Sequence, residues 1–322
     1  MNGVLIIDKP AGLTSHDVVN RVRRILNQKS VGHLGTLDPM ATGVLPLVIG
    51  SFTRLAQFYL ASEKTYEGAI RFGFSTDTYD AEGEPTSTAT TVSLSREVLE
   101  AAAERFRGTI AQTPPPFSAK KIKGLPAYKL ARQQKEVRLE PVQIEIKEFE
   151  MLSLEGDRAS FHACVGSGTY MRSVAHDLGQ ALGCGAHLAS LRRTSVAEFT
   201  EVEAHTLDEI EKMQSFLNVS KNCHPDRSFA FPQGKASGVD GPCVSHDLEP
   251  LFVHPRKLLP ALPSVTADEM AIAQIRHGRS VNLPELSRAR QVKVFSGQRD
   301  LIAIATRIAG TLFHPRIVLC GS

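Results

Sequence analysis

The first part of the chain combines short apolar runs with one amphipathic stretch. The run GVLIIDK at residues 3–9 predicts a short buried strand, which Pro10 ends. Residues 14–27 carry apolar side chains at helical spacing behind Thr14 or Ser15 as N-cap, and they predict an amphipathic helix. Its apolar stripe consists of Val18, Val22, Ile25 and Leu26.

Two further strands are predicted downstream of this helix. Residues 32–42 are rich in turn-forming residues and predict a loop that leads into an apolar strand over 43–50. Residues 64–76 alternate apolar and polar side chains and predict another strand. A turn-rich loop follows at 76–85.

The middle of the chain predicts a helix, a long loop and a hairpin. Residues 93–110 have the apolar period of an amphipathic helix. Residues 111–139 contain a proline run and many basic residues, which predict a loop with a short helix at 126–134. Residues 142–168 alternate as a β-hairpin with its turn at 155–157.

The remaining segments predict three helices, a linker and a small β-rich end. Helices are predicted at 169–183 and 206–217, and residues 186–200 predict a helix or loop that enters a strand. Residues 219–250 are rich in Gly, Pro, Ser and Asp and predict a flexible linker or insert.

After the linker, residues 266–278 predict a compact helix closed by Gly278, and 291–319 predict about three short strands. We therefore expect a main domain over 1–217, a linker over 218–255 and a small C-terminal domain over 256–322.

The composition is that of a folded, soluble protein. The chain has 322 residues, of which 42% are hydrophobic and 22% charged, and a net charge of only +3. Its five cysteines include no C-x-x-C pair, and the N-terminus does not resemble a signal peptide, so we expect free thiols and a cytoplasmic location. No apolar run is long enough to span a membrane.

Basic residues are concentrated between positions 118 and 138, where Glu136 is the single acid and Tyr128 is interleaved. Lysine and arginine release counterions when they neutralise phosphates, so such a run suits a nucleic-acid backbone. A loop kept in solution by its charge explains the same composition. Further basic clusters at 21–24 and 191–195 favour nucleic acid. The residues of the main run are Lys120, Lys121, Lys123, Lys129, Arg132, Lys135 and Arg138.

A single carboxylate, Asp38, lies in the stretch GHLGTLDPMATGVLPLVIG at residues 32–50. A residue before proline commonly starts a turn, and this alone explains an aspartate there. The alternative is a catalytic carboxylate, for which Arg172 is a candidate partner and otherwise a surface arginine. His33, Tyr66 and Tyr170 are either ordinary half-buried residues or planar groups that stack on a base.

Metal chemistry has little support in the sequence. The pairs Cys223–His224 and Cys243-x-x-His246 do not have a standard zinc spacing and lie in the predicted insert. The motifs of P-loop, dinucleotide-binding, zinc-protease and α/β-hydrolase sites are absent from the sequence. We therefore expect no metal site.

Six motifs together resemble the TruB family of bacterial tRNA pseudouridine-55 synthases, in that family's order and over most of residues 3–200. The segment at 258–278 and the β-rich end resemble the family's PUA-type RNA-binding domain. The motifs are KPAGLTSHDVVNRVRR, GHLGTLDPMATGVLPLVIG, KTYEGAIRFGFSTDTYDAEGE, PPPFSAKKIKGLPAYKLAR, GSGTYMRSVAHDLG and HLASLRRTSV.

The resemblance implies an α+β fold: a catalytic domain with a central, mainly antiparallel sheet, and a small β-rich PUA-like domain. Asp38 is implied as the essential aspartate, Arg172 as its partner and Tyr66 as the tyrosine that packs against the target base. Tyr170 and Leu191 are implied to line the uridine pocket.

His33 is implied to stack within the opened loop of the RNA. The implied activity is isomerisation of uridine 55 in the T loop of tRNA, with no cofactor and no obligate protein partner. The target base must be flipped out of its stack, since a stacked nucleotide is out of reach.

One carboxylate suffices for this chemistry, because nothing is oxidised or hydrolysed. An ionised Asp38 can stabilise positive charge at C1′, attack that carbon, or start an elimination across the sugar, and the sequence does not choose among these routes. Two other functions stay open: an RNA chaperone without catalysis, and an RNA-associated zinc protein. A monomer is expected by default.

Overall fold

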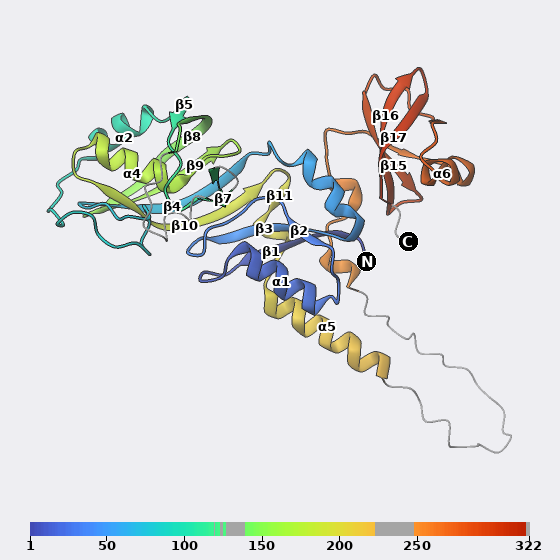
Figure 1. Cartoon of the computed structure of the whole chain (residues 1–322), viewed down its shortest axis with the longest axis horizontal. Helices are drawn as coiled ribbons and strands as arrows, with labels where there is room; N and C mark the ends of the chain where they lie inside the picture. Colours follow the sequence, from blue (N-terminus) through green and yellow to red (C-terminus); the bar gives the residue numbers. More distant parts are fainter. Residues whose placement is uncertain (119, 123–124, 127–138, 223–247, 320–322) are drawn as a thin grey trace, which may run out of the picture.

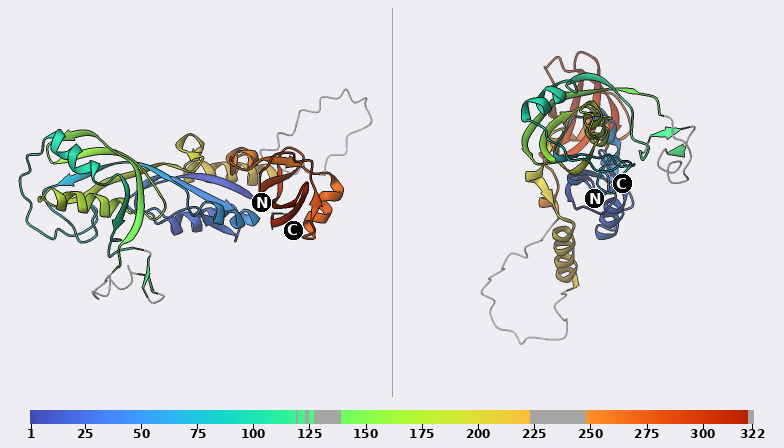
Figure 2. Two further views of the ribbon diagram at one scale, coloured as in Figure 1. Left: turned by 90° about the horizontal axis from the view of Figure 1, so that it is seen from above. Right: turned by 90° about the vertical axis from the view of Figure 1, so that its left-hand side faces the viewer.

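A computed structural model of the chain describes residues 1–322 except 119, 123–124, 127–138, 223–247 and 320–322. The molecule is elongated, with a large sheet along most of its length and a small domain at one end (Figure 1). Both views in Figure 2 place the N-terminus beside this C-terminal domain. In the described part of the chain, no helix is both long and apolar enough to cross a membrane.

The large sheet has ten strands, and its main path runs β12-β1-β3-β10-β4-β9-β8-β5. Neighbours pair antiparallel except β1 with β12 and β3 with β10, which confirms the predicted mainly antiparallel sheet. The short strands β2 and β11 pair at its margin with β3 and β10. The strands are β1 (Gly3–Lys9), β2 (Val31–His33), β3 (Thr42–Ile49), β4 (Lys64–Phe72), β5 (Gly108–Gln112), β8 (Val142–Glu155), β9 (Arg158–Val165), β10 (Ala186–Val196), β11 (Phe199–Thr200) and β12 (Ala204–His205).

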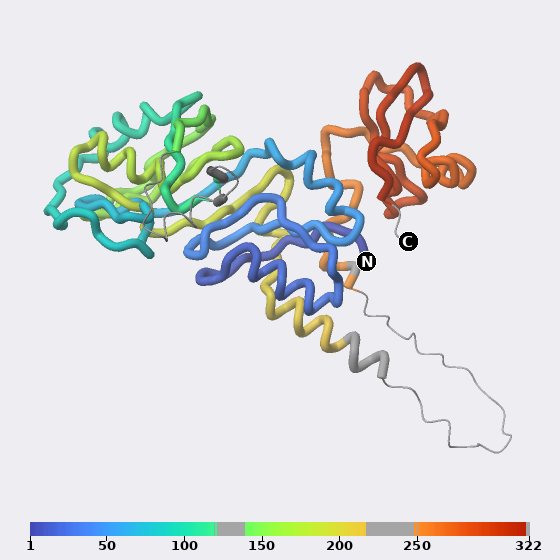
Figure 3. The backbone as a smooth tube through the Cα atoms, viewed as in Figure 1, coloured from blue at the N-terminus to red at the C-terminus, as the bar shows by residue number. Residues whose placement is uncertain are grey.

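Helices cover the sheet at two separate places. The N-terminal and C-terminal helices of the main domain, α1 and α5, run side by side, whereas α2 and α4 lie at the opposite end (Figure 3). Thr14 and Asp17 form a capping box that starts α1, as the N-cap prediction implied. The helices are α1 (Ser15–Ile25), α2 (Arg96–Glu104), α4 (Met171–Ala181) and α5 (Leu207–Asn222), with 3-10 turns η1 (Gly50–Phe58) and η2 (Glu201–Glu203).

Three sequence predictions need correction. The helix predicted over 93–110 ends at Glu104, because Gly108 takes a left-handed φ of +86° and begins β5. Residues 186–196 form no helix but the strand β10, in which two β-bulges interrupt the apolar–polar alternation. The predicted loop before β3 contains the short strand β2.

The predicted helix at 126–134 lies outside the described residues, apart from Pro126. That residue belongs to a two-stranded ribbon of β6 (Lys121–Ile122) and β7 (Leu125–Pro126).

Strand β1 is buried on both faces, which explains why its sequence is continuously apolar. Leu5 and Ile7 belong to the main core beneath α1, whereas Val4 and Ile6 face a second core. Successive side chains of a strand point to opposite faces, so this one strand joins the two cores. The second core also contains Phe295 of the C-terminal domain.

The C-terminal domain is a five-stranded sheet in the order β13-β15-β16-β17-β14 with one helix. The predicted helix and three strands are confirmed, and Asp268 caps the helix. The elements are β13 (Ser264–Thr266), α6 (Glu269–Arg276), β14 (Val281–Asn282), β15 (Gln291–Ser296), β16 (Asp300–Ala309) and β17 (Leu312–Val318), preceded by the 3-10 turns η3 (Glu249–Leu251) and η4 (Pro255–Lys257).

Polar contacts join this domain to the main one. Ser51 Oγ donates to the Leu319 carbonyl at 2.6 Å, and the Glu198 carboxylate accepts from Tyr59 OH at 2.6 Å and from the Leu259 amide at 2.8 Å. The described end of the predicted linker is also packed, since Leu251 is buried in the main core.

Candidate active site

A cavity of about 260 Å³ lies where the loop before β3, the strands β4 and β10 and the start of α4 meet. Of the six residues to which the resemblance gave catalytic or substrate-binding roles, five line this cavity together. The lining residues are Gly35, Thr36, Leu37, Asp38, Lys64, Tyr66, Ser167, Gly168, Thr169, Tyr170, Met171, Arg172, Leu191 and Arg193.

The loop that carries Asp38 is fixed by a glycine turn and by hydrogen bonds to α1. Gly35 adopts a left-handed φ of +122°, which turns the chain after β2. Leu37 is buried, and its amide and carbonyl both bond the hydroxyl of Ser15 at 2.8 and 3.1 Å. The helix α1 therefore fixes the residue directly before Asp38.

Two buried cations donate hydrogen bonds to the backbone of the same loop. Arg193 donates to the carbonyls of Val44, Thr36 and Gly35 at 2.8, 3.3 and 3.0 Å. Lys9 Nζ donates to the carbonyls of Pro10, Pro39 and Ala41, at distances from 2.6 to 3.1 Å. Both side chains are fully buried. Each cation replaces the solvent of several backbone carbonyls and fixes the loop on both sides of Asp38.

Burial shifts the pKa values of these cations. It lowers the pKa of Lys9 to about 8, although the nearby Asp38 charge acts in the opposite direction. It also lowers the pKa of Arg193, against which the Tyr66 hydroxyl acts.

Asp38 and Arg172 form a two-pronged ion pair across the cavity. Asp38 Oδ2 accepts from Arg172 Nε at 2.9 Å, and Oδ1 accepts from Nη2 at 3.0 Å. The Arg172 side chain is only 5% exposed, whereas the Asp38 side chain is 32% exposed. The arginine thus orients the carboxylate, while the exposed part of Asp38 faces the cavity.

The remaining donors of Arg172 are also used. Its guanidinium donates to the carbonyls of Thr78 and Phe117 at 3.1 and 2.9 Å, and Nη1 lies 3.7 Å from Asp80 Oδ2. Arg172 stands in the first turn of α4, where the helix dipole disfavours a cation. The carboxylates of Asp38 and Asp80 offset that cost.

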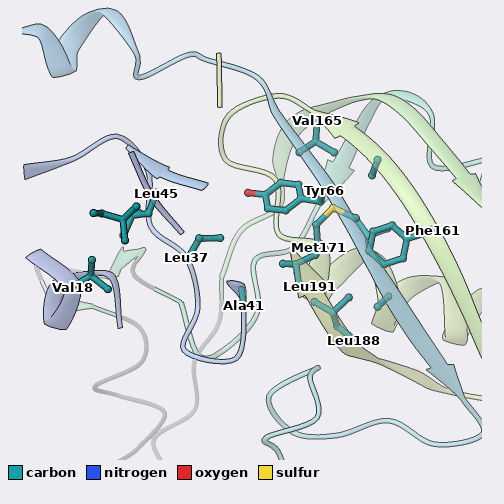
Figure 4. Packing of buried hydrophobic residues seen from close by; sticks show 14 of the residues in the cluster. Val18, Leu37, Ala41, Leu45, Tyr66, Phe161, Val165, Met171, Leu188 and Leu191 are labelled. Carbon is teal, nitrogen blue, oxygen red and sulfur yellow. The ribbon is translucent and has the colours of Figure 1, made fainter. Parts of the chain in front are cut away.

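Tyr66 and Leu191 form an apolar wall of the cavity. They lie on the paired strands β4 and β10, and both are 7% exposed. The Tyr66 hydroxyl points away from Phe161 and toward the side where Leu37 lies (Figure 4). Tyr66 and Asp38 thus line the same cavity.

Tyr170 reaches the cavity from the N-cap position of α4, and its backbone is held by Gln112 at the end of β5. The Gln112 side chain accepts from the Tyr170 amide at 2.9 Å and donates to its carbonyl at 3.1 Å. Burial raises the pKa of the Tyr170 phenol.

His33 is not among the described residues that line the cavity. It lies at the end of β2, with its Nδ1 atom buried and without a hydrogen-bond partner in the described structure. Burial, followed by the charge of Arg193, lowers the pKa of its ring. Its predicted stacking role stays a prediction.

Three arginines of the two smaller basic clusters are engaged within the protein, and the role of these clusters in binding nucleic acid stays a prediction. Arg21 binds Glu211 and Asp208 at 2.7 and 2.8 Å. Arg192 pairs with Asp8, and Arg193 is buried. These acidic partners lie far away in the sequence, so the sequence alone did not reveal the ion pairs.

The main basic run stays a prediction. Its described members are Lys120, which is half-buried, and Lys121, which begins β6. The other residues fall outside the described part of the chain: Lys123, Lys129, Arg132, Lys135 and Arg138.

A second cavity, of about 700 Å³, lies in the C-terminal domain and contains Arg290 and Arg316 but no carboxylate. It lacks an acid or base for catalysis. Among the described residues, no group of His, Cys, Asp or Glu is arranged to hold a metal ion. The predicted Cys and His pairs between 223 and 246 lie outside those residues.

Sequence reasoning missed several residues that shape the site. Lys9 follows an apolar strand and precedes a proline, and that position was the available signal for a buried anchor. Arg193 was hidden in an apparently solvated cluster. Asp80 and Gln112 gave no signal of their own, because Arg172 and Tyr170, which they contact, are distant in sequence. Lys64 gave none because a lysine at the start of a predicted strand is normally solvated.

The arrangement can act on a polar, planar ring linked to a carbon that accepts a nucleophile. Its carboxylate is positioned in advance and partly screened from water, and aromatic side chains flank it. An aromatic wall gives a flat ring about 1–3 kcal/mol of stacking per base.

Comparison with known proteins identifies the family. Residues 23–171 match the family model described as TruB family pseudouridylate synthase, N-terminal domain. Residues 172–224 match tRNA pseudouridylate synthase B, C-terminal domain. The boundary between the two falls directly before Arg172.

Relatives of known name extend over the full chain. The tRNA pseudouridine synthase B of Solibacter usitatus is 49% identical over 322 residues, 99% of this chain and 100% of that protein. The one from Azoarcus is 36% identical and covers 99% of this chain and 95% of its own length.

Among solved structures, the archaeal box H/ACA sRNP Nop10–Cbf5 complex matches with a TM-score of 0.66 and 24% identity, over 99% of this chain and 86% of that chain. This likeness concerns the fold alone.

Proposed function

The chain belongs to the TruB family of pseudouridylate synthases, and from this membership and the cavity around Asp38 we propose that it isomerises uridine 55 in the T loop of tRNA to pseudouridine. The observation that carries the proposal is the two-pronged pairing of Asp38 with Arg172 at the wall of a cavity that also contains Tyr66. We propose that Asp38 is the catalytic residue.

The reaction exchanges one glycosidic bond for another. An oxygen of Asp38 attacks C1′ of the ribose, and N1 of the uracil leaves with the bonding electrons. The detached base turns in place, C5 attacks C1′, and the carboxylate is displaced. C5 then loses its proton to a base or to water and N1 takes up a proton, so that the neutral, conjugated uracil ring is restored.

The residues that line the cavity have different roles in these reaction steps. Arg172 holds the carboxylate at a fixed angle and balances its charge while C1′ becomes electron-poor. Tyr66 supports the flipped uracil, and Tyr170 and Leu191 limit its movement after the glycosidic bond has broken. The half-closed cavity keeps the free base from leaving.

The RNA is held by contacts outside this cavity. We assign phosphate contacts to the basic run that includes Lys120 and Lys121, and His33 to stacking within the opened T loop. The arginines of the C-terminal cavity, Arg290 and Arg316, suit a further segment of the RNA backbone. We propose that the protein acts in the cytoplasm as a monomer with the T arm of tRNA as its substrate.

The test uses tRNA transcript with tritium at C5 of uridine. The protein is expected to release tritium to water, because C5 loses its hydrogen in the final step. Asp38→Asn keeps the shape of the side chain and is expected to bind the tRNA with normal affinity but release no label. Normal release by Asp38→Asn would overturn the catalytic assignment. Binding without release by either protein would favour an RNA chaperone.

A further inference from the structure

The residues that line the cavity carry more positive than negative charge. Its titratable side chains include one carboxylate, Asp38, and three cations, Lys64, Arg172 and Arg193. Asp38 and Arg172 neutralise each other, and Arg193 donates to three backbone carbonyls. Among the described residues neither Arg193 nor Lys64 pairs with a carboxylate, but Lys64 makes one hydrogen bond to a backbone carbonyl where Arg193 makes three.

Lys64 is positioned by the sheet. It begins β4 and pairs with Val196 of β10 and Val165 of β9. It precedes Tyr66 by two residues, and alternate residues of a strand point to the same face. The lysine therefore stands beside the tyrosine that we assign to the target base.

The ammonium group of Lys64 makes fewer hydrogen bonds in the described structure than it has donors. Nζ donates to the Ser62 carbonyl at 2.6 Å, and an ammonium has three donors. In the described structure, no carboxylate lies within ion-pair distance of Lys64 Nζ. The neighbouring Glu63 pairs with Lys147. Within the described part of the chain, two of its three donors are thus left for a ligand.

Positive charge also accumulates around this group. The stem of Lys64 and the Arg193 guanidinium flank Gly35, whose hypothetical Cβ would lie 3.6 Å from Lys64 Cε and 3.5 Å from Arg193 Nη1. Burial and, after it, the charge of Arg193 together lower the pKa of Lys64 to about 8. A cation in this environment is stabilised by an anionic ligand.

We propose that the Lys64 ammonium binds a phosphate of the flipped nucleotide itself and so sets the position of its uracil over Asp38. This inference rests on the proposed function, because that substrate brings a uracil, a ribose and their phosphodiesters into one cavity. The phosphodiester is the anionic group of such a nucleotide. Lys64 is in this view a positioning residue, distinct from the basic run that holds the RNA elsewhere.

The test combines a protein change with a change in one phosphate. T-arm hairpins are made with an uncharged methylphosphonate directly 5′ or directly 3′ of the target uridine, with tritium at C5. The protein, Lys64→Gln and Lys64→Arg are compared by kcat/KM for tritium release. Lys212→Gln, on the exposed face of α5, is the matched control and is expected to behave as the unchanged protein.

With the unmodified hairpin, Lys64→Gln is expected to lose about 10- to 100-fold in kcat/KM, the usual effect of one hydrogen bond to a charged group. At one of the two positions, the methylphosphonate is expected to slow the unchanged protein by a similar factor but to slow Lys64→Gln less than about twofold. Lys64→Arg is expected to keep its sensitivity to that linkage.

Equal methylphosphonate penalties in the unchanged protein and in Lys64→Gln, at both positions, would overturn the proposal. Thermal unfolding shows whether each variant is folded. A failure of the proposed function looks different, because the unchanged protein then releases no tritium from the unmodified hairpin.

Discussion

Arg172 meets both oxygens of the Asp38 carboxylate, at 2.9 and 3.0 Å, and so fixes the plane as well as the position of that group. Two parallel bonds leave the carboxylate little freedom to rotate. Catalysis by such a group depends on geometry set before the substrate arrives.

Arg172→Lys is expected to lower the single-turnover rate of tritium release by about 100-fold or more, because an ammonium cannot form the two parallel bonds to the carboxylate. The affinity for tRNA is expected to change by less than about threefold, since Arg172 is buried and is not assigned to the RNA backbone. Arg71→Lys is the matched control, because Arg71 pairs with Asp157 outside the cavity lining. A rate near normal in Arg172→Lys would show that a single point charge suffices.

The close contact between β3 and β10 gives a second prediction. Gly43 has a φ of +98°, and a Cβ there would lie 2.2 Å from the Arg193 carbonyl oxygen. Gly108 has a φ of +86° and open space around the same position. We expect Gly108→Ala to cost about 1–2 kcal/mol of unfolding free energy from backbone strain alone, and Gly43→Ala to cost more than about 3 kcal/mol.

Urea unfolding measures both values, and tritium release then shows whether the displaced strand also moves the Asp38 loop. If the two alanine variants lose the same stability, the strands separate more easily than the structure implies.

Asp177 on α4 gives a pH-dependent prediction. Burial raises the pKa of its carboxyl from 3.8 to about 6. Between these values the native state binds more protons than the unfolded chain, so this group makes stability fall as the pH rises from about 3.8 to about 6. Asp177→Asn removes the charge and is expected to raise the free energy of unfolding by about 1–2 kcal/mol at about pH 8.

At about pH 5 that gain is expected to shrink to about half, since the native carboxyl is then largely protonated. Urea unfolding at the two pH values measures it, with the exposed Asp300→Asn as control. A gain of the same size at both pH values would mean that burial of the charge is not its cause.

The sequence predicted most helices and strands because their apolar periods are regular, as in α1 and the β8–β9 hairpin. It failed in β10, where two bulges remove the alternation that identifies a strand. The family motifs pointed to Asp38, Arg172 and Tyr66.

They did not show that Arg193 and Lys9 are buried beneath the Asp38 loop. A basic residue is normally solvated, and only tertiary packing shows that backbone carbonyls have replaced its water.

The second core has a consequence for how the molecule unfolds. Phe295 and Ile304 of the C-terminal domain share this core with Val4 and Val48 of the large sheet, so neither domain can separate without exposing apolar surface of both. We therefore expect the two ends of the protein to unfold in one cooperative transition. A destabilising substitution at Phe295, far along the chain from Asp38, is then expected to lower the temperature at which the Asp38 loop also unfolds.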